Sequence, residues 1–537
     1  MRGIGLPGAA FAALLGVSFA ATAAEPRIGK FVSYEMEDFT ITTSRGAVQA
    51  RHFMEDLAKF RITLEKTLGK RAAKSGIPTH ILVVSGCEWQ KYLQPRQNIA
   101  GWFQRGRFAN YMVMNGDAAE QEATHIIFHE YTHFFLSSQF AGEYPPWFNE
   151  GLAELMGFAK FDKNMAVLQI PMYRVYEARD GDWIPFERLI RVDHGSPEYQ
   201  SHKLADSFYA QAWLTVHYGL VENRQFGVQM IDYLRHLNQL RPLDEAAKLT
   251  FGADLASVDK QLRDYSRNKH MMSGGLDLGA LPVLTLPAGK PVAELDALAI
   301  ITDLMIETRL APDRTRPMVE SLARREPNSA RGSILAARLA LLEDDDKAFD
   351  AAVTRAASLL ATGDWQARRD LASVLLASAL DFRPMSKRTT EESERDMTRA
   401  MRWFGEAVAH NNEDVEALWG FGTAATRLDK DLDLAGQALE LAYHRAPASA
   451  DIAMSLANLK GRQQQPEAMI PFLKDVIRFS NNRSQTKWAA ETLIQMQEYA
   501  AERERVDAEN RKQREAYEKQ MADYEKKYGK VKKKSAK

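Results

Sequence analysis

Two histidines and a glutamate lie at the centre of an apolar stretch that runs from Ile126 to Leu136. They are His129, Glu130 and His133, in the order H-E-x-x-H. On a helix, residues four apart share a face, with Cβ atoms about 5–6 Å apart. The two imidazoles can therefore bind one metal ion, and the glutamate beside them can act as general base on a water molecule. Burying these polar groups without a metal or another partner would be costly.

A third ligand comes from the segment 144–156. Two prolines near its start suit a turn and the first turn of a helix, and apolar residues then recur on one helical face. Glu150 lies on the other side, where it can complete a His2Glu zinc site and leave the fourth position to water. Glu154, one turn further, can hydrogen-bond a ligand imidazole and fix its tautomer. The sequence therefore predicts one Zn2+ per chain, bound by His129, His133 and Glu150.

These two segments resemble the gluzincin branch of zinc metallopeptidases, which includes thermolysin and the aminopeptidase N-like enzymes. The branch shares H-E-x-x-H followed by N-E-x-x-x-[DE], and residues 149–154 (N-E-G-L-A-E) match the second pattern. The 16 residues between His133 and Glu150 are fewer than usual in that branch, which indicates a tight turn between the helices. The metzincin pattern is excluded, because it requires glycine where this chain has Leu136. The stretch 145–154 is also similar to small bacterial gluzincin-like domains.

The resemblance implies an α+β zincin-like catalytic domain, with a small mixed sheet and helices, that hydrolyses peptide bonds. Glu130 would take a proton from water and pass it to the leaving amine. In aminopeptidase N-like enzymes a tyrosine near the start of a later helix stabilises the oxyanion, and Tyr209 in the helical stretch 204–220 resembles it. His217 and Tyr218 are the alternatives for this role.

The residues before the motif predict the sheet. They are an extended segment over 29–42, a helix over 46–69, a strand over 78–85, and a hairpin of residues 100–103 and 110–115. In gluzincins the strand before the zinc helix pairs with the substrate backbone, so the resemblance implies that role for residues 110–114. An ordinary core strand is the alternative. The aminopeptidase motif G-x-M-E-N has no counterpart at residues 101–104 (G-W-F-Q), which slightly favours an endopeptidase.

Residues 1–24 have the pattern of a secretory signal peptide, with Arg2, an apolar run over 9–21 and an A-x-A type cleavage site. The alternative is a membrane anchor, but a spanning helix needs about 20 apolar residues, and no other segment predicts one. Cys87 is the only cysteine, which excludes an intrachain disulfide. The 70 basic and 71 acidic residues nearly balance, so overall charge does not indicate nucleic-acid binding. We expect a bacterial protein that is periplasmic or secreted.

The second half of the chain predicts a different architecture. A catalytic domain over 25–270 is followed by residues 271–291, rich in glycine and proline, which indicate a linker. Residues 292–495 are helical and alanine-rich, with turn-like pairs that begin at 327, 363, 411, 447 and 481, at intervals of 36, 48, 36 and 34 residues. A period near 34 is typical of tetratricopeptide repeats, whose solenoid offers a concave face for peptides or protein partners. An irregular helical bundle is the alternative.

Residues 496–537 predict a charged helix, solvated or coiled-coil, with a basic tail. The whole sequence therefore predicts an α+β zincin-like domain followed by an all-α tetratricopeptide-like solenoid. Its expected function is that of a periplasmic or secreted zinc metallopeptidase whose helical repeats bind protein partners or substrate. The alternatives are a catalytically inactive zincin-like scaffold of the cell envelope and a zinc hydrolase that acts on another amide.

Overall fold

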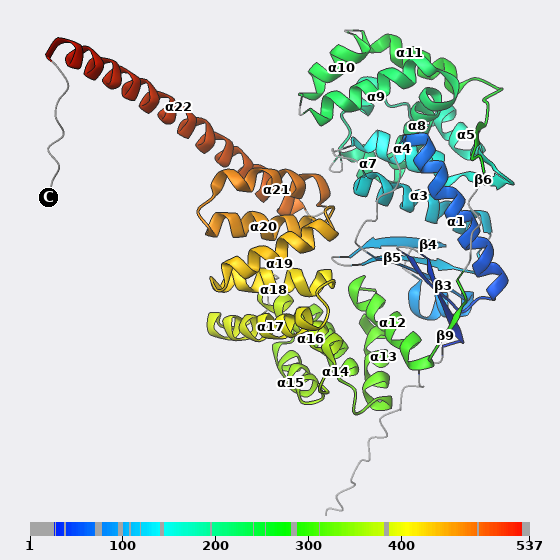
Figure 1. The fold of residues 1–537 in the computed structure, drawn as a ribbon. Helices are drawn as coiled ribbons and strands as arrows, with labels where there is room; N and C mark the ends of the chain where they lie inside the picture. Colours follow the sequence, from blue (N-terminus) through cyan, green and yellow to red (C-terminus); the bar gives the residue numbers. More distant parts are fainter. Residues whose placement is uncertain are drawn as a thin grey trace, which may run out of the picture.

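A computed structural model describes most of the chain as a small mixed sheet with helices, followed by a long all-helical, repeat-like region (Figure 1). The described residues are 26, 28–36, 39–69, 78–94, 100–106, 109–118, 120–139, 144–193, 196–239, 241–252, 254–280, 287–310, 312–380, 386–480 and 483–528. The expected signal peptide and the basic end of the tail lie outside these residues.

The main sheet has six described strands in the order β4-β5-β3-β2-β1-β9. Strands β2, β3 and β5 run parallel to one another, whereas β1, β4 and β9 pair antiparallel with their neighbours, so the sheet is mixed as expected. The strands are β1 (Phe31–Met36), β2 (Phe39–Thr43), β3 (Thr79–Val84), β4 (Gly101–Arg105), β5 (Asn110–Asn115) and β9 (Lys290–Val292). The extended segment expected over 29–42 is two strands, β1 and β2.

Both faces of this sheet are buried, as alternate residues of β3 show. Side chains alternate between the faces of a strand. Ile81 and Val83 join the core beneath α1 (Ala47–Leu68) and α3 (Glu120–Gln139), whereas Leu82 joins the core formed with α12 (Glu294–Glu307). The second core also contains residues of α13 (Pro312–Arg325) and α14 (Ala330–Leu342). The expected boundary at residue 292 therefore does not separate two cores, because the first helices of the repeat-like region cover the sheet.

The expected linker, residues 271–291, is partly built into both sheets. Its residues Gly274–Asp277 form β8, which completes a three-stranded antiparallel sheet with β6 (Ala159–Asp162) and β7 (Met165–Leu168). Its last residues enter β9, the edge strand beside β1. The central residue of β9 is Pro291, which an edge strand tolerates because one side of its backbone needs no ladder hydrogen bond.

Helices fill the rest of the first half. The long ones pack behind α3 in the same core as the inner face of the sheet. They are α4 (Pro146–Gly157), α5 (Met172–Asp180), α8 (His202–His217), α9 (Arg224–Asn238), α10 (Leu243–Phe251) and α11 (Leu255–Ser266). The short ones are α2 (Gly86–Glu88), η1 (Trp89–Leu93), α6 (Phe186–Leu189), α7 (Pro197–Gln200) and η2 (Tyr218–Glu222).

The second half consists of consecutive helices that pack pairwise (Figure 1). They are α15 (Asp346–Ser358), α16 (Trp365–Leu380), α17 (Thr390–His410), α18 (Val415–Leu428), α19 (Leu432–Arg445), α20 (Ala450–Arg462) and α21 (Pro466–Phe479), followed by α22 (Arg483–Tyr528). Turns lie at 327–328, 362–363, 412–413 and 447–448, within one residue of the predicted positions. None of the described helices combines the length and apolar character that a bilayer crossing requires.

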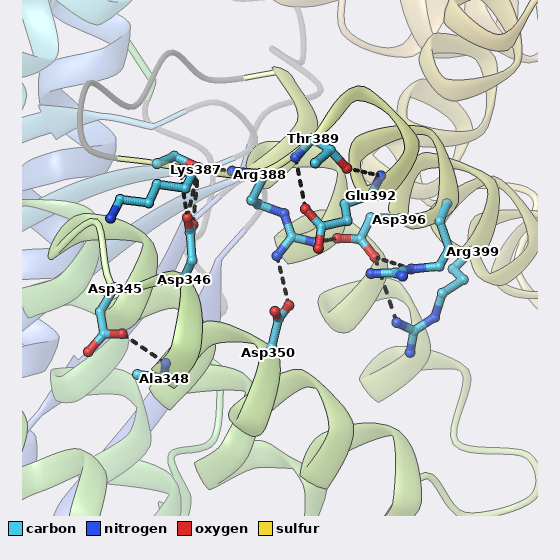
Figure 2. A network of polar contacts seen from close by, with 12 residues as sticks. Asp345, Asp346, Ala348, Asp350, Lys387, Arg388, Thr389, Glu392, Asp396 and Arg399 are labelled. Atoms are coloured by element: carbon cyan, nitrogen blue, oxygen red, sulfur yellow. Dashed lines mark hydrogen bonds and ion pairs between the residues drawn. The ribbon is translucent and has the colours of Figure 1, made fainter.

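The longest repeat interval, 48 residues, is held by a buried arginine (Figure 2). Arg388 precedes α17, with its side chain 5% exposed, and forms an ion pair with Asp396, whose side chain is 3% exposed. It also donates to Asp350 on α15 over 2.7 Å, and that partner is 54% exposed. Thr389 caps α17 in a capping box with Glu392. The start of α17 is therefore tied to α15 by charge.

Arg388→Ala should destabilise the repeat-like region by roughly 3 kcal/mol, because it leaves Asp396 buried without its main partner. Asp350→Ala, which breaks the exposed arm of the same network, should cost less than about 1 kcal/mol. Urea unfolding of both variants, followed by circular dichroism, measures the difference. Equal losses in the two variants would contradict this account of the network.

Candidate metal centre

Helices α3 and α4 lie side by side and each divides its residues between a core face and a polar face. On α3, Phe128 stacks on Phe60 of α1 with ring centroids 4.0 Å apart, and Tyr131 is buried in the same core. The neighbouring positions His129 and His133 turn toward α4. Pro146 occupies the first turn of α4, as the sequence predicts, and the apolar face of that helix is fully buried.

Three donor atoms converge between the two helices. The Nε2 atoms of His129 and His133 are 3.1 Å apart. Oε2 of Glu150 lies 3.4 Å from Nε2 of His129 and 3.3 Å from Nε2 of His133. The structure therefore brings together the three residues that the sequence predicts as metal ligands, despite the short spacer between the helices.

This spacing fits a tetrahedral ion. Zinc binds histidine nitrogen and carboxylate oxygen at about 2.0–2.2 Å, and two ligands of a tetrahedron with such bonds lie about 3.3–3.5 Å apart. The donor set of two imidazoles and one carboxylate is also one that catalytic zinc sites use. The residues present thus fit a zinc ion in both chemistry and separation.

An acceptor lies behind each imidazole, near its other nitrogen. Oδ1 of Asn149 lies 3.0 Å from Nδ1 of His133, and because this oxygen can only accept, the proton resides on Nδ1. Oε1 of Glu154 lies 3.4 Å from Nδ1 of His129. The Asn149 contact is a hydrogen bond and favours a proton on Nδ1 of His133, whereas Glu154 faces Nδ1 of His129 without forming a hydrogen bond to it.

The charges at the centre favour a cation. Burial alone would lower the pKa of His133, but the Glu150 carboxylate raises it to about 9. Burial alone would raise the pKa of Glu150, but the two imidazoles hold it well below its ordinary value. Glu150 is therefore ionised at neutral pH, whereas His133 carries a proton that a metal would have to displace.

A second group of possible donors shares His129 and adds His125 and Glu154. It is less suited to an ion, because Arg174 of α5 donates to both oxygens of Glu154, over 3.0 and 3.1 Å. His125 stacks on Phe158, with ring centroids 4.1 Å apart, and burial lowers its pKa to about 4. Glu154 therefore lies beside the first group, close to Nδ1 of His129, but the hydrogen bond that the sequence predicts between them is not formed.

The sequence analysis missed two residues at the centre. Arg174 neutralises Glu154, and Tyr199 of α7 donates its hydroxyl to Oε1 of Glu150 over 2.8 Å. Neither lies in a motif. Arg174 is 20 residues from Glu154 and Tyr199 is 49 residues from Glu150, so only the fold reveals these contacts.

Tyr209 lies beside the predicted ligands. Burial raises its pKa, and the charges of Glu150, Glu154 and Glu130 add to this effect, which places all three carboxylates within electrostatic reach of the phenol. A side-chain hydrogen bond joins it to Tyr199. Glu130 also influences the neighbouring His133. Tyr209 is therefore connected to Glu150 through Tyr199, and Arg174 lies over its ring, 5.5 Å from the centroid.

The alternatives to Tyr209 lie elsewhere. Both ring nitrogens of His217 are engaged, by the hydroxyl of Tyr265 at 2.8 Å and the carbonyl oxygen of Met272 at 3.1 Å. The hydroxyl of Tyr218 accepts from Asn223 at 2.8 Å. The contacts of His217 tie α8 to Tyr265 of α11 and to Met272 after it, so both of its ring nitrogens are occupied.

The strand expected to pair with substrate is not at an edge. Residues 110–114 lie in β5, which pairs with β3 on one side and β4 on the other, so the role expected for them is wrong. The edge strand is β4, whose Gly101 packs against Ile126 of α3. Backbone hydrogen bonds join Asn115 to Ala100 at one end of the β4–β5 hairpin and Gly106 to Ala109 at the other. They show which residues of β4 bond to β5 and which point their backbone groups away from it. In an antiparallel pair the residues between bonded positions point their backbone groups outward, here Gly101 and Phe103.

Comparisons with known proteins give little. A scan against models of protein families finds none that matches the chain, and a search of curated proteins finds no match. Among solved structures, the chain matches one described as "YrrB: a TPR protein with an unusual peptide-binding site". The match has 14% identity and a TM-score of 0.27, and covers 36% of this chain and 90% of that one. A likeness at this level carries no argument, so the repeat-like character rests on the helix pairs themselves.

Arg174→Ala should weaken zinc binding about 10–100-fold, the usual effect of removing a group that orients a metal ligand. Without Arg174, Glu154 is buried and uncompensated and its carboxylate is no longer held beside the ring of His129. Competition with a chromophoric chelator measures the affinity. Arg179→Ala is the matched control, because Arg179 lies on the same helix and pairs only with exposed Asp180 among the described residues. Equal affinities in the two variants would overturn the positioning role.

Proposed function

We propose that this protein is a zinc-dependent peptidase whose metal is bound by His129, His133 and Glu150. The observation that supports this most is the convergence of three donor atoms, all within 3.4 Å of one another, between α3 and α4. Three neutral or anionic donors at this separation are stabilised by a cation between them. The resemblance of the motifs to gluzincins supports the same conclusion from the sequence.

A zinc ion at this position would lower the pKa of water and polarise the attacked carbonyl. The chain's own residues supply the proton transfers. Glu130, next to His129 in the chain and charge-coupled to His133, takes the proton of the attacking water and returns it to the leaving amine. Tyr209 donates its hydroxyl to the developing oxyanion. Its raised pKa keeps the phenol protonated, as a donor must be.

Tyr199 has a different role from Tyr209 in this scheme. Its hydroxyl is committed to Oε1 of Glu150, the oxygen that does not face the two imidazoles. It therefore orients the carboxylate so that Oε2 faces the metal. Its hydrogen bond with Tyr209 also holds the second phenol near the site.

The β4 edge is where an extended substrate would bind. The outward amide and carbonyl groups of Gly101 and Phe103 face the side of β4 on which no described strand pairs. A peptide can add to such an edge as a further strand. The edge lies against α3 at Ile126, one turn before Glu130. We therefore propose an endopeptidase that takes an extended segment, with the helical repeats available to protein partners or substrate.

The rival proposal is a catalytically inactive zincin-like scaffold of the cell envelope. The intact pair of His133 and Glu130 disfavours it, as does the orientation of the His133 imidazole by Asn149. A structural helix pair would not require two buried carboxylates to face two histidines. The leader at residues 1–24 is the ground for proposing a periplasmic or secreted location.

Elemental analysis should find close to one zinc per chain in the purified protein and in Glu130→Gln. It should find almost none in His133→Ala, which removes a ligand. His125→Asn is the matched control: it disrupts the second donor group and should retain the metal. Zinc retained by His133→Ala but lost from His125→Asn would transfer the site to the second group. No zinc in any of them after reconstitution would favour the scaffold.

Hydrolysis of fluorescein-labelled casein tests the catalytic roles separately from metal binding. Glu130→Gln should lower kcat by about 10²–10⁴-fold through loss of the general base. Tyr209→Phe should lower kcat by about 10²–10³-fold with little change in KM, because the phenol acts on the transition state. Tyr173→Phe, which removes a half-exposed hydroxyl near Arg174, is the control and should be nearly silent. If Tyr209→Phe changed KM alone, Tyr209 would bind substrate without stabilising the oxyanion.

A further inference from the structure

Helix α22 extends away from the rest of the chain (Figure 1). Its first turns pack against α21 through Ala489 and Leu493. From residue 501 to 527 nearly every side chain is exposed. At 1.5 Å per residue this part is about 40 Å long. A helix in a protein gains most of its stability from packing one face against another element. We therefore expect this exposed part of α22 to pack against a partner.

One face of this exposed part carries its large apolar side chains. Tyr499, Val506 and Tyr517 are 50%, 49% and 63% exposed. At 100° per residue they fall, with Met521, within a sector of about 60°. Tyr524, 49% exposed, lies in the same sector. We call this sector, together with the two polar residues inside it, the seam: Tyr499, Arg503, Val506, Asn510, Tyr517, Met521 and Tyr524. The remaining faces are mostly charged, which is the pattern of a helix that associates along one side.

The charges along the helix are divided between its two halves. Residues 498–509 contain five acidic and two basic side chains, whereas residues 510–527 contain four acidic and six basic ones. A second copy running parallel and in register would place like charges together. A copy running antiparallel would place the acidic half of each helix against the basic half of the other, which is favourable.

The seam is also nearly symmetric about Asn510. Tyr499 and Met521 lie 11 residues to either side of it, and Arg503 and Tyr517 lie 7 residues to either side. An antiparallel pair centred on Asn510 therefore sets Tyr499 of one copy beside Met521 of the other, and Tyr517 beside Arg503. Sulfur–aromatic and cation–π contacts are both favourable. Arg503 pairs with Glu467 through an exposed contact, which leaves its aliphatic stem free to cover the ring.

We infer that α22 is a dimerisation helix, whose seam packs antiparallel against the same seam of a second copy of this chain. The two asparagines face each other at the centre and fix the register, as a polar residue in an apolar seam does in coiled coils. In this dimer the rest of each chain, before α22, lies at opposite ends of the helix pair. The inference does not depend on the metal centre, so the two can fail separately.

Sedimentation equilibrium of the full chain over a concentration series tests the dimer. The expected mass at high concentration is twice that of one chain. Val506→Lys, on the seam, should raise the dissociation constant at least tenfold, because position 506 lies opposite Arg514 of the other copy in this register. Ala501→Lys is the matched control, because it adds the same charge on the opposite face and should leave the dimer unchanged. A monomer at every concentration, or equal effects of the two variants, would overturn the inference.

Disulfide crosslinking tests the orientation in chains that also carry Cys87→Ser. Tyr499→Cys and Met521→Cys should each fail to crosslink with themselves and should crosslink with each other when mixed and allowed to exchange. A parallel pair would give the reverse and would contradict the antiparallel seam. Flotation with vesicles of phosphatidylserine and phosphatidylcholine tests whether the seam binds a membrane surface instead of a second copy. A monomer that floats through its intact seam would assign this face to a membrane surface instead.

Discussion

The close approach of α4 to α8 is the constraint on which the candidate site depends. Helix α4 carries Glu150 and Glu154, and α8 carries Tyr209. Between them Gly151 lies so near the backbone of Ala212 that a Cβ atom there would collide with its carbonyl oxygen. The glycine is therefore required for the two helices to meet at this distance. A larger residue would separate Tyr209 from Glu150 without touching either, so the glycine between the two acids of the motif has a packing reason.

Charge balance explains why so many ionisable groups tolerate burial here. Glu150 and Glu154 are 5% and 3% exposed, and an isolated buried carboxylate would be expensive. Arg174 balances Glu154 through a bidentate contact, which is the geometry in which arginine binds carboxylates best. Glu150 has no arginine, and in the metal-free chain only a proton shared with the histidines balances it, as the raised pKa of His133 shows. A divalent ion would replace that proton. The two acids of one motif thus have different counter-ions, and only one of these positions can accept a metal.

Local patterns were sufficient for the elements that carry the centre, and insufficient for the residues that support it. The four-residue spacing of His129 and His133 and the prolines before α4 predict helices that the structure has. The helix expected over 46–69 is α1, which ends at Gly69 in the left-handed conformation. Arg174 and Tyr199 could not be found this way, because their contacts join segments far apart in sequence. The same reason explains the error about β5: the sequence predicts its hairpin with β4, but no local pattern reveals that the distant strand β3 pairs with its other edge.

The covering of the sheet by α12 to α14 also joins the two halves of the chain through a shared core. Burial raises the pKa of Tyr111 on β5 to about 12, and the charges of Glu307 and Arg338 from α12 and α14 act on it next. At the other end, burial raises the pKa of Tyr144 to about 12 against the opposing charge of Arg478 on α21. The repeat-like helices thus approach the first half both at the sheet and at the residue just before α4. These two contacts are far apart in sequence on both sides, so the helices of the second half meet the first half at more than one place.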